Sequence, residues 1–134
     1  MKPALIAALI AAALSGCASD PLQLESDKTY RVEWIGERPP IERSHLTITL
    51  GADGRAYGSA GCNHWFAGYR REGEQLHFEQ AGSTRKLCAP ALMEQERRFL
   101  EILGRVQRWD VSAIGQLRLW PGAGKPIRLW PEEG

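Results

Sequence analysis

Cys62, Asn63 and His64 stand side by side in the stretch SAGCNHWFAGY, which spans residues 59–69. Catalysis and metal binding both use these three residue types. One interpretation is catalytic, with Cys62 as a nucleophile and His64 as its base. A second is a zinc site formed by Cys62, His64 and Cys88. A third is structural, with Cys62 bonded to Cys88 in a disulfide.

The spacing of these residues argues against the zinc and thiol interpretations. Zinc sites use ligands at recognisable spacing, and the sequence contains neither a C-x-x-C pair nor an H-x-x-x-H pair. A catalytic thiol needs a base that a third group orients, and no such group is apparent beside His64. We therefore predict no metal site and no catalytic residue in this stretch.

The first residues, MKPALIAALIAAALSGC, are typical of a secretory signal. Lys2 precedes an apolar run, residues 4–14, that is too short to span a bilayer. The small residues Ser15 and Gly16 directly before Cys17 resemble the lipobox of bacterial lipoproteins, in which the cysteine is lipidated. An ordinary signal peptide cut nearby is the alternative, and both interpretations imply export.

Three regions follow from this interpretation. We expect residues 1–16 to be a lipoprotein signal peptide, residues 17–27 to be the lipidated cysteine and a tether, and residues 28–134 to form the domain. The protein is then a membrane-anchored lipoprotein that faces the periplasm. Ala18, in place of the aspartate associated with inner-membrane retention, favours the outer membrane.

The cysteine count now favours the disulfide. A lipidated Cys17 leaves Cys62 and Cys88 in a compartment where disulfides persist, so these two cysteines are expected to pair. The length of 134 residues supports one domain. Removal of residues 1–16 takes Lys2 from the 17 basic residues and leaves 16 against 16 acidic ones, so the protein has no electrostatic reason to bind nucleic acid.

Alternating apolar residues predict an antiparallel, curved or barrel-like sheet of about seven strands, and a 3.6-residue period predicts one helix from Pro90 to about Val106. The fold class is therefore α+β. Phe99 is expected to be fully buried on the helix. The face of the helix opposite its apolar positions is expected to be solvated; its residues are Glu94, Gln95, Arg97, Arg98 and Glu101.

A near-repeat, LRLWP at 117–121 and IRLWP at 127–131, predicts a hairpin. Leu119 would face Ile127 and Leu117 would face Leu129 on the buried side. The same register sets Arg118 against Arg128, a repulsive pair that the sequence does not explain. The hairpin places Trp120 and Trp130 on the other face, either as an exposed aromatic surface or, as we favour, packed under the helix.

The chain resembles the META-domain family, which includes the HslJ-type bacterial heat-shock lipoproteins. The resemblance covers roughly residues 29–129 and is carried by Gly61, Asn63, Tyr69, Thr84, Arg85, Met93 and Glu94, with Cys62 and Cys88 in the same order. Where family members have a residue like methionine, this chain has Lys86, which predicts a more exposed loop. The resemblance implies a small barrel-like sheet with one helix in an exported protein linked to stress tolerance. It supplies no catalytic residues.

Two classes of function remain. The first is a non-enzymatic binding or stress-protection module of the envelope, without a cofactor, whose partner is an apolar ligand or an envelope protein. The second is a hydrolytic or other enzyme that uses His64 and Glu94, with Glu96. Glu94 and Glu96 are two residues apart on the predicted helix and so point in different directions, which disfavours the enzyme. Asn63 is expected to bond backbone groups beside the disulfide rather than a ligand.

Overall fold

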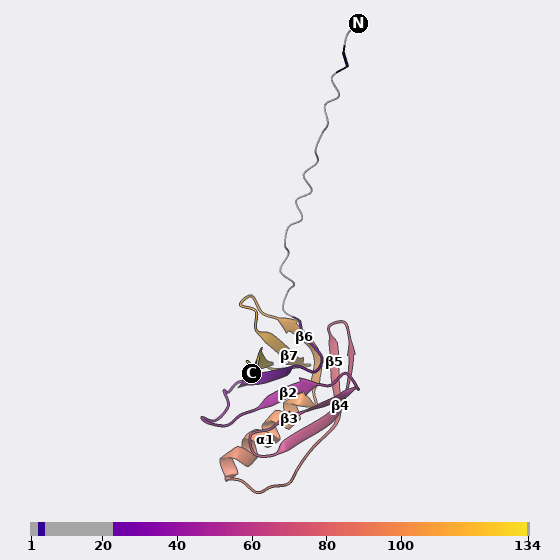
Figure 1. Ribbon diagram of the computed structural model, residues 1–134. Coiled ribbons are helices and arrows are strands. Elements are labelled where there is room, and N and C mark those ends of the chain that lie inside the picture. The colour runs from indigo at the N-terminus through magenta and orange to yellow at the C-terminus, as the bar shows by residue number, and fades with distance from the viewer. Residues whose placement is uncertain (1–2, 5–22, 134) are drawn as a thin grey trace.

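Eight antiparallel strands close into a barrel in the computed structural model, which describes residues 3, 4 and 23–133 (Figure 1). The strands are β1 (Thr29–Ile35), β2 (Thr47–Leu50), β3 (Arg55–Ser59), β4 (His64–Glu72), β5 (Gln75–Ser83), β6 (Val106–Val111), β7 (Leu117–Pro121) and β8 (Ile127–Pro131). Each strand pairs with the next, and β8 returns to β1. One helix, α1 (Pro90–Leu103), lies between β5 and β6 in the sequence.

The predicted α+β class, a barrel-like sheet with one helix, is confirmed. The strands number eight against about seven predicted, and one of them, β4, overlaps the SAGCNHWFAGY stretch. Cys17 and the expected signal peptide cleavage site lie outside the described residues. In the segment expected to be a tether, Leu24 is buried in the core. Within residues 3–4 and 23–133, no helix is long and apolar enough to cross a membrane.

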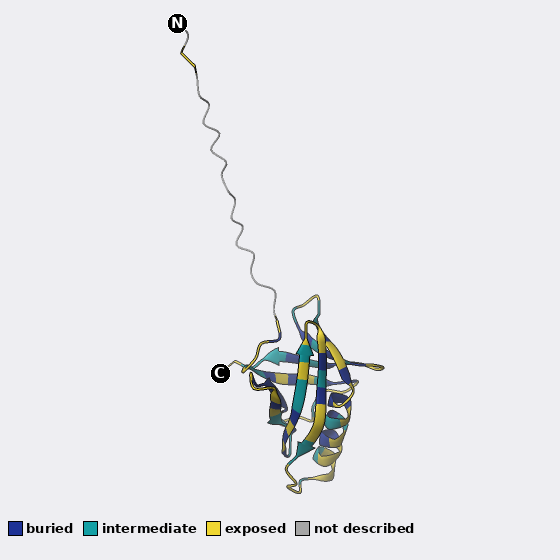
Figure 2. Cartoon of the chain, turned by 90° about the vertical axis from the view of Figure 1, so that its right-hand side faces the viewer, coloured by how far each residue is buried: buried dark blue, intermediate teal, exposed yellow. Residues whose placement is uncertain are grey.

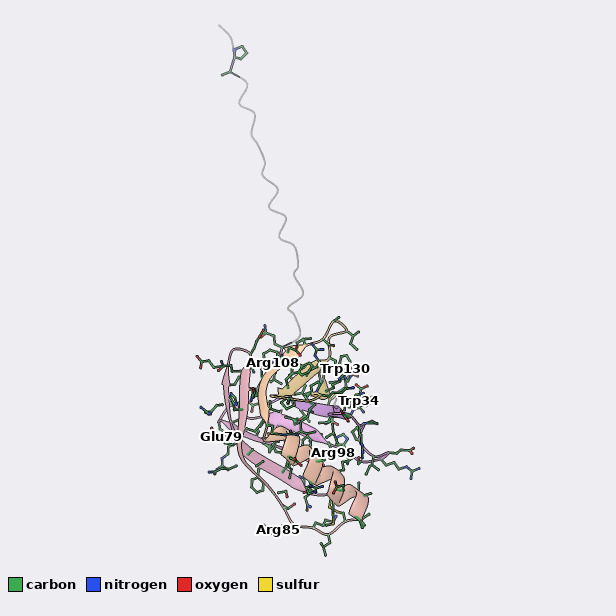
Figure 3. The ribbon with its side chains drawn as sticks, turned by 180° about the vertical axis from the view of Figure 1, so that it is seen from behind. Trp34, Glu79, Arg85, Arg98, Arg108 and Trp130 are labelled. Atoms are coloured by element: carbon green, nitrogen blue, oxygen red, sulfur yellow. A yellow bond between two sulfur atoms is a disulfide. The ribbon has the colours of Figure 1, made fainter. Side chains whose placement is uncertain are left out.

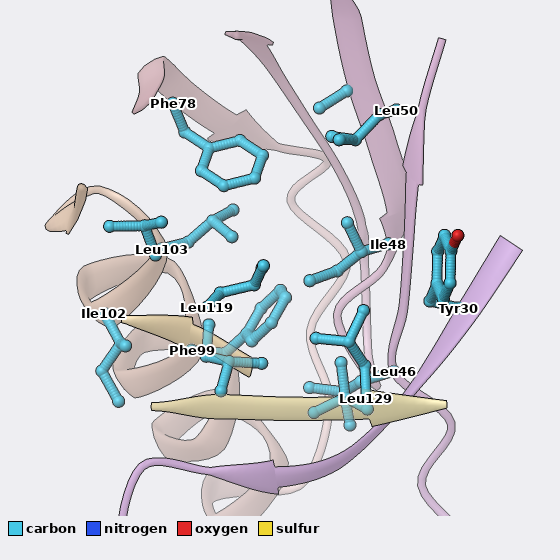
Figure 4. Packing of buried hydrophobic residues seen from close by; sticks show 14 of the residues in the cluster. Tyr30, Leu46, Ile48, Leu50, Phe78, Phe99, Ile102, Leu103, Leu119 and Leu129 are labelled. Atoms are coloured by element: carbon cyan, nitrogen blue, oxygen red, sulfur yellow. The ribbon is translucent and has the colours of Figure 1, made fainter. Parts of the chain in front are cut away.

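The barrel interior is filled by apolar side chains that alternate with outward polar ones, as the burial colours along the strands show (Figure 2). Leu46, Ile48 and Leu50 project inward from the β2 region, and Phe99, Ile102 and Leu103 project from α1 to meet them (Figure 4). Their burial provides the main favourable contribution to folding. The interior is therefore a packed core.

The hairpin of β7 and β8 has the predicted register, with Leu119 opposite Ile127 and Leu117 opposite Leu129. Arg118 does lie opposite Arg128, and Asp110 on β6 explains how this pair is tolerated. Asp110 accepts two hydrogen bonds from Arg118, at 2.7 and 2.8 Å. Burial alone would raise the pKa of Asp110, but the hydrogen bonds from Arg118 and Trp120 outweigh it, so the pKa of Asp110 is lowered.

The favoured placement of Trp120 and Trp130 under the helix is wrong. Both tryptophans are half-buried on the outside of the barrel, and Trp130 lies away from α1 (Figure 3). The Trp120 indole donates to Asp110 at 2.8 Å, and the Trp130 indole donates to Glu33. Arg108 and Arg118 stack on the Trp120 ring. Side chains alternate along a strand, so both rings lie on the face opposite the inward leucines of β7 and β8, whereas α1 packs with those leucines in the core.

Helix α1 begins at Pro90, as predicted, and ends at Leu103, so Val106 belongs to β6. Phe99 is fully buried, which confirms its predicted position. The prediction of a solvated polar face is wrong for Gln95, which is buried and contacts the loop before β2. Its Oε1 accepts from Ile41 N at 2.6 Å, and its Nε2 donates to Ser44 Oγ at 3.1 Å.

The small residues before the disulfide allow close packing. At Gly58 the close neighbour is β2, since an added Cβ would clash with Thr47 O. At Gly61 the neighbour is the helix, because an added Cβ would lie 3.0 Å from Gln95 Nε2. Gly61 also has a φ of +97°, a conformation that L side chains rarely adopt.

Candidate functional site

Cys62 and Cys88 form the predicted disulfide, with their Cα atoms 6.1 Å apart. Cys62 precedes β4, and Cys88 lies in the 84–89 loop that connects β5 to α1. The bond therefore fixes this loop against the start of β4. Because both sulfur atoms are in the bond, neither cysteine provides a thiolate for nucleophilic attack or metal binding.

Asn63 fixes the same loop through hydrogen bonds, as predicted. Its Oδ1 accepts from Lys86 N at 2.7 Å and from Thr84 Oγ1 at 3.0 Å. Its Nδ2 donates to Lys86 O at 3.2 Å. Asn63 is buried, and two of these bonds satisfy the backbone N–H and C=O groups of Lys86, which lies in the loop and not in a strand. The disulfide and Asn63 thus hold the loop at two neighbouring points.

Glu96 of α1 completes the arrangement from the helix side. The residue is only 7% exposed, and its carboxylate accepts from Asn63 Nδ2 at 3.1 and 3.2 Å and from Asn63 N at 3.3 Å. Burial of an ionised group is costly unless it is hydrogen-bonded. Asn63 provides these hydrogen bonds. Because its side chain also binds Thr84 and Lys86, it connects the start of β4, the 84–89 loop and α1 in one polar network.

A pocket of about 570 Å³ lies beside this network, between β5 and α1. Its size falls in the range of 300–1,000 Å³ that is usual for ligand sites. Its lining residues are Asn63, Ala81, Gly82, Ser83, Thr84, Arg85, Lys86, Leu87, Met93, Glu96, Arg97 and Leu100. Apolar side chains form much of its open wall, because Leu87 is 84% exposed and Met93 is 42% exposed.

The rim of the pocket is basic. Arg85 and Lys86 are exposed, and within the described part of the chain no ion pair joins either residue to an acid. Arg85 lies on the loop that leads into α1 (Figure 3). Arg97 is paired with Glu94 at 2.6 Å. The Lys86 exposure confirms the prediction drawn from its departure from the family pattern.

The structure brings together only some of the predicted motif residues. Asn63, Thr84, Arg85 and Met93 line the pocket. The remaining motif residues, Gly61, Tyr69 and Glu94, are not among its lining residues. Tyr69 donates from its hydroxyl to Gly51 O at 2.5 Å, at the opposite end of β4, and its role is to close a turn.

Several pocket residues were not predicted to line a site, among them Leu87 and Leu100, and Glu96 was named only with the disfavoured enzyme. Glu96 carried a usable signal, because it lies three residues before the buried Phe99 on the same helix. His64, the candidate base, is exposed, and no hydrogen bond or ion pair among the described residues joins its ring to Glu94 or Glu96. Within residues 23–133, no three side chains of the metal-binding types cluster as a metal site would require.

Comparison with known proteins bears on the fold and the family. The model of the META domain family matches residues 20–134. An NMR structure of a protein from Burkholderia xenovorans is 24% identical, with a TM-score of 0.69 over 87% of this chain and 93% of that one. A second NMR structure is 23% identical, with a TM-score of 0.59 over 76% of this chain and 86% of that one. At this level of identity, both similarities show that the fold is shared.

A comparison with curated proteins found no match. The family match spans the tightly packed barrel, the disulfide and the whole pocket between β5 and α1. The protein belongs to the META domain family.

Proposed function

We propose that this protein is an exported, lipid-anchored binding module of the cell envelope, which acts in stress protection and binds its partner at the pocket between β5 and α1. The observation that carries the proposal is the pocket itself. Its base is fixed by the disulfide and by the bonds between Asn63 and Glu96, whereas its wall exposes Leu87 and Met93. A fixed base with exposed apolar walls suits binding, because little conformational freedom is lost when a ligand enters.

The same contacts disfavour an enzyme. Asn63 uses its side-chain oxygen and nitrogen within the network, and Glu96 accepts its bonds from Asn63. Glu94 is bound to Arg97 on the surface of the helix. General acid–base catalysis needs groups within hydrogen-bond reach of a substrate, and the groups of the predicted alternative, His64 and Glu94, are not brought together.

Replacement of Cys17 by alanine tests the anchor. The lipobox-like sequence supports lipidation at Cys17, so Cys17→Ala is expected to move the protein from the membrane pellet to the soluble periplasmic fraction. Immunoblots of fractionated cells provide the measurement, with the unchanged chain as the control. A variant that remains in the pellet after a high-salt wash would rule out the lipid anchor.

Binding at the pocket is tested by two matched substitutions of exposed apolar residues. Leu87 lies at the pocket, and Ile114, 76% exposed, lies at the turn between β6 and β7. We expect Leu87→Ser to reduce the recovery of the partner from envelope extracts, and Ile114→Ser to leave it unchanged. Equal recovery with both variants would exclude the pocket. Turnover of an ester, peptide or glycan that His64→Ala abolishes would favour the enzyme instead.

A further inference from the structure

Strand β5 has an unpaired edge along most of its length. Its pairing with β6 is confined to one end, where Gln75 lies opposite Arg108 and Trp109 N donates to Glu74 O at 2.9 Å. From residue 76 to residue 83, the described chain supplies β4 on one side of β5 and no strand on the other. Helix α1 lies on that other side, across the pocket. An open strand edge is a template for pairing with another chain.

The register shows which backbone groups face the pocket. Thr84 N donates to His64 O at 3.0 Å, and Ser83 lies opposite Trp65. Neighbouring residues of an antiparallel strand direct their backbone groups to opposite sides, so Ser83, next to Thr84, directs its N–H and C=O groups away from β4. These groups lie at the pocket, which Ser83 lines together with Ala81 and Gly82.

The facing wall suits the side chains of an added strand. Met93 and Leu100 of α1 line the pocket opposite β5, and they offer an apolar surface to side chains that point inward. Successive side chains of a strand point to opposite faces, so only every second residue of a bound peptide would meet this surface. Strand addition of this kind takes its affinity from backbone hydrogen bonds and its specificity from alternate side chains.

The charge of the rim selects among peptides. Arg85 and Lys86 are free of ion pairs with described residues, and the one buried acid of the pocket, Glu96, is bound by Asn63. An acidic peptide is complementary to this rim, and a basic peptide is repelled by it.

From these observations we infer that the pocket binds an extended segment of an envelope protein by strand addition to residues 81–83 of β5. The segment has apolar residues at alternate positions and aspartate or glutamate between them. This inference rests on the proposed binding function of the same pocket, and it adds the class of partner and the mode of recognition.

The test uses an array of randomised, N-acetylated octapeptides probed with the protein purified from the envelope. Peptides with the alternating acidic and apolar pattern should be enriched among the binders. Fluorescein-labelled copies of the best binder are then methylated at one backbone amide at a time, and their affinities are measured by fluorescence anisotropy. Methylation should weaken binding about tenfold or more at every second amide, because each methyl group removes a hydrogen bond and leaves its acceptor on β5 without a partner.

Matched variants of the protein complete the test. Ser83→Pro removes the N–H that faces the pocket and should weaken binding about tenfold or more, whereas Ser83→Ala keeps that N–H and should change binding less than about twofold. Circular dichroism melting shows whether Ser83→Pro is folded; if it is not, the methylation series decides alone. The charge reversals Arg85→Glu and Lys86→Glu should together weaken acidic peptides most.

Each outcome decides the inference. Methylation effects without a two-residue period, or equal binding by the folded Ser83→Pro and Ser83→Ala proteins, would overturn strand addition. An array without binders would do the same. If Leu87→Ser still reduces recovery of an envelope partner in that case, the proposed function stands and only the peptide class is wrong. If Leu87→Ser also has no effect, both proposals fail.

Discussion

Truncation of Phe99 to alanine is expected to lower the free energy of unfolding by about 3–5 kcal/mol. The ring is fully buried and packs edge-on against Trp65, with ring centroids 5.8 Å apart. Alanine would leave a cavity between α1 and the barrel, where neighbours held by the closed sheet can relax only partly. Urea unfolding followed by tryptophan fluorescence measures the loss.

Met93→Ala is the control for this prediction. Met93 lies on the same helix and is 42% exposed, so its truncation should cost less than about 1 kcal/mol. A loss of under about 1 kcal/mol for Phe99→Ala as well would show that α1 contributes little to the core.

Removal of the disulfide is expected to have the second-largest effect. The bond joins residues 26 positions apart, and the chain-entropy model assigns a loop of that length about 3–4 kcal/mol. The double variant Cys62→Ala, Cys88→Ala should therefore unfold at a much lower urea concentration than the unchanged protein. Reductant should lower the midpoint of the unchanged protein in the same direction and should leave the midpoint of the double variant unaffected.

The state of the cysteines is checked independently. The native mature protein should show no maleimide-reactive thiol at Cys62 or Cys88, and its intact mass should lack the two thiol hydrogens. A reduced mass in protein taken from an oxidising periplasm, or zinc retained after dialysis, would contradict the structural role and return Cys62 to the candidates for a reactive site.

Patterns that repeat over many residues made part of the fold predictable. The β7–β8 register followed from two copies of one alternating motif, and the helix followed from its apolar period. The predicted number of strands was one too low, because a bulge between Phe66 and Gly68 interrupts the alternation of apolar residues in β4. The two tryptophans of the hairpin were misplaced because the sequence does not reveal that Asp110 and Glu33 bind their indole groups on the outside of the barrel.

The site was predictable only in part. Asn63 and the cysteines were identified from residue type, expected compartment and family likeness. Gln95 and Glu96 were not recognised as buried, because polar residues usually face solvent unless specific partners satisfy them. Those partners, Asn63 for Glu96 and Ile41 and Ser44 for Gln95, are far away in the sequence. The pocket itself exists because β6 pairs with only one end of β5, a tertiary feature that no local pattern encodes.

The central claim, that a partner binds between β5 and α1, is tested most directly by the methyl resonance of Met93. The sequence contains two methionines, Met1 and Met93, so protein that lacks residues 1–16 has Met93 as a single labelled probe in the wall of the pocket. Titration with an envelope peptide that binds the protein should shift this resonance until the site is saturated. Leu87→Ser should weaken this response, and Ile114→Ser should leave it unchanged. A ligand that binds the protein and leaves the Met93 resonance in place would contradict the claim.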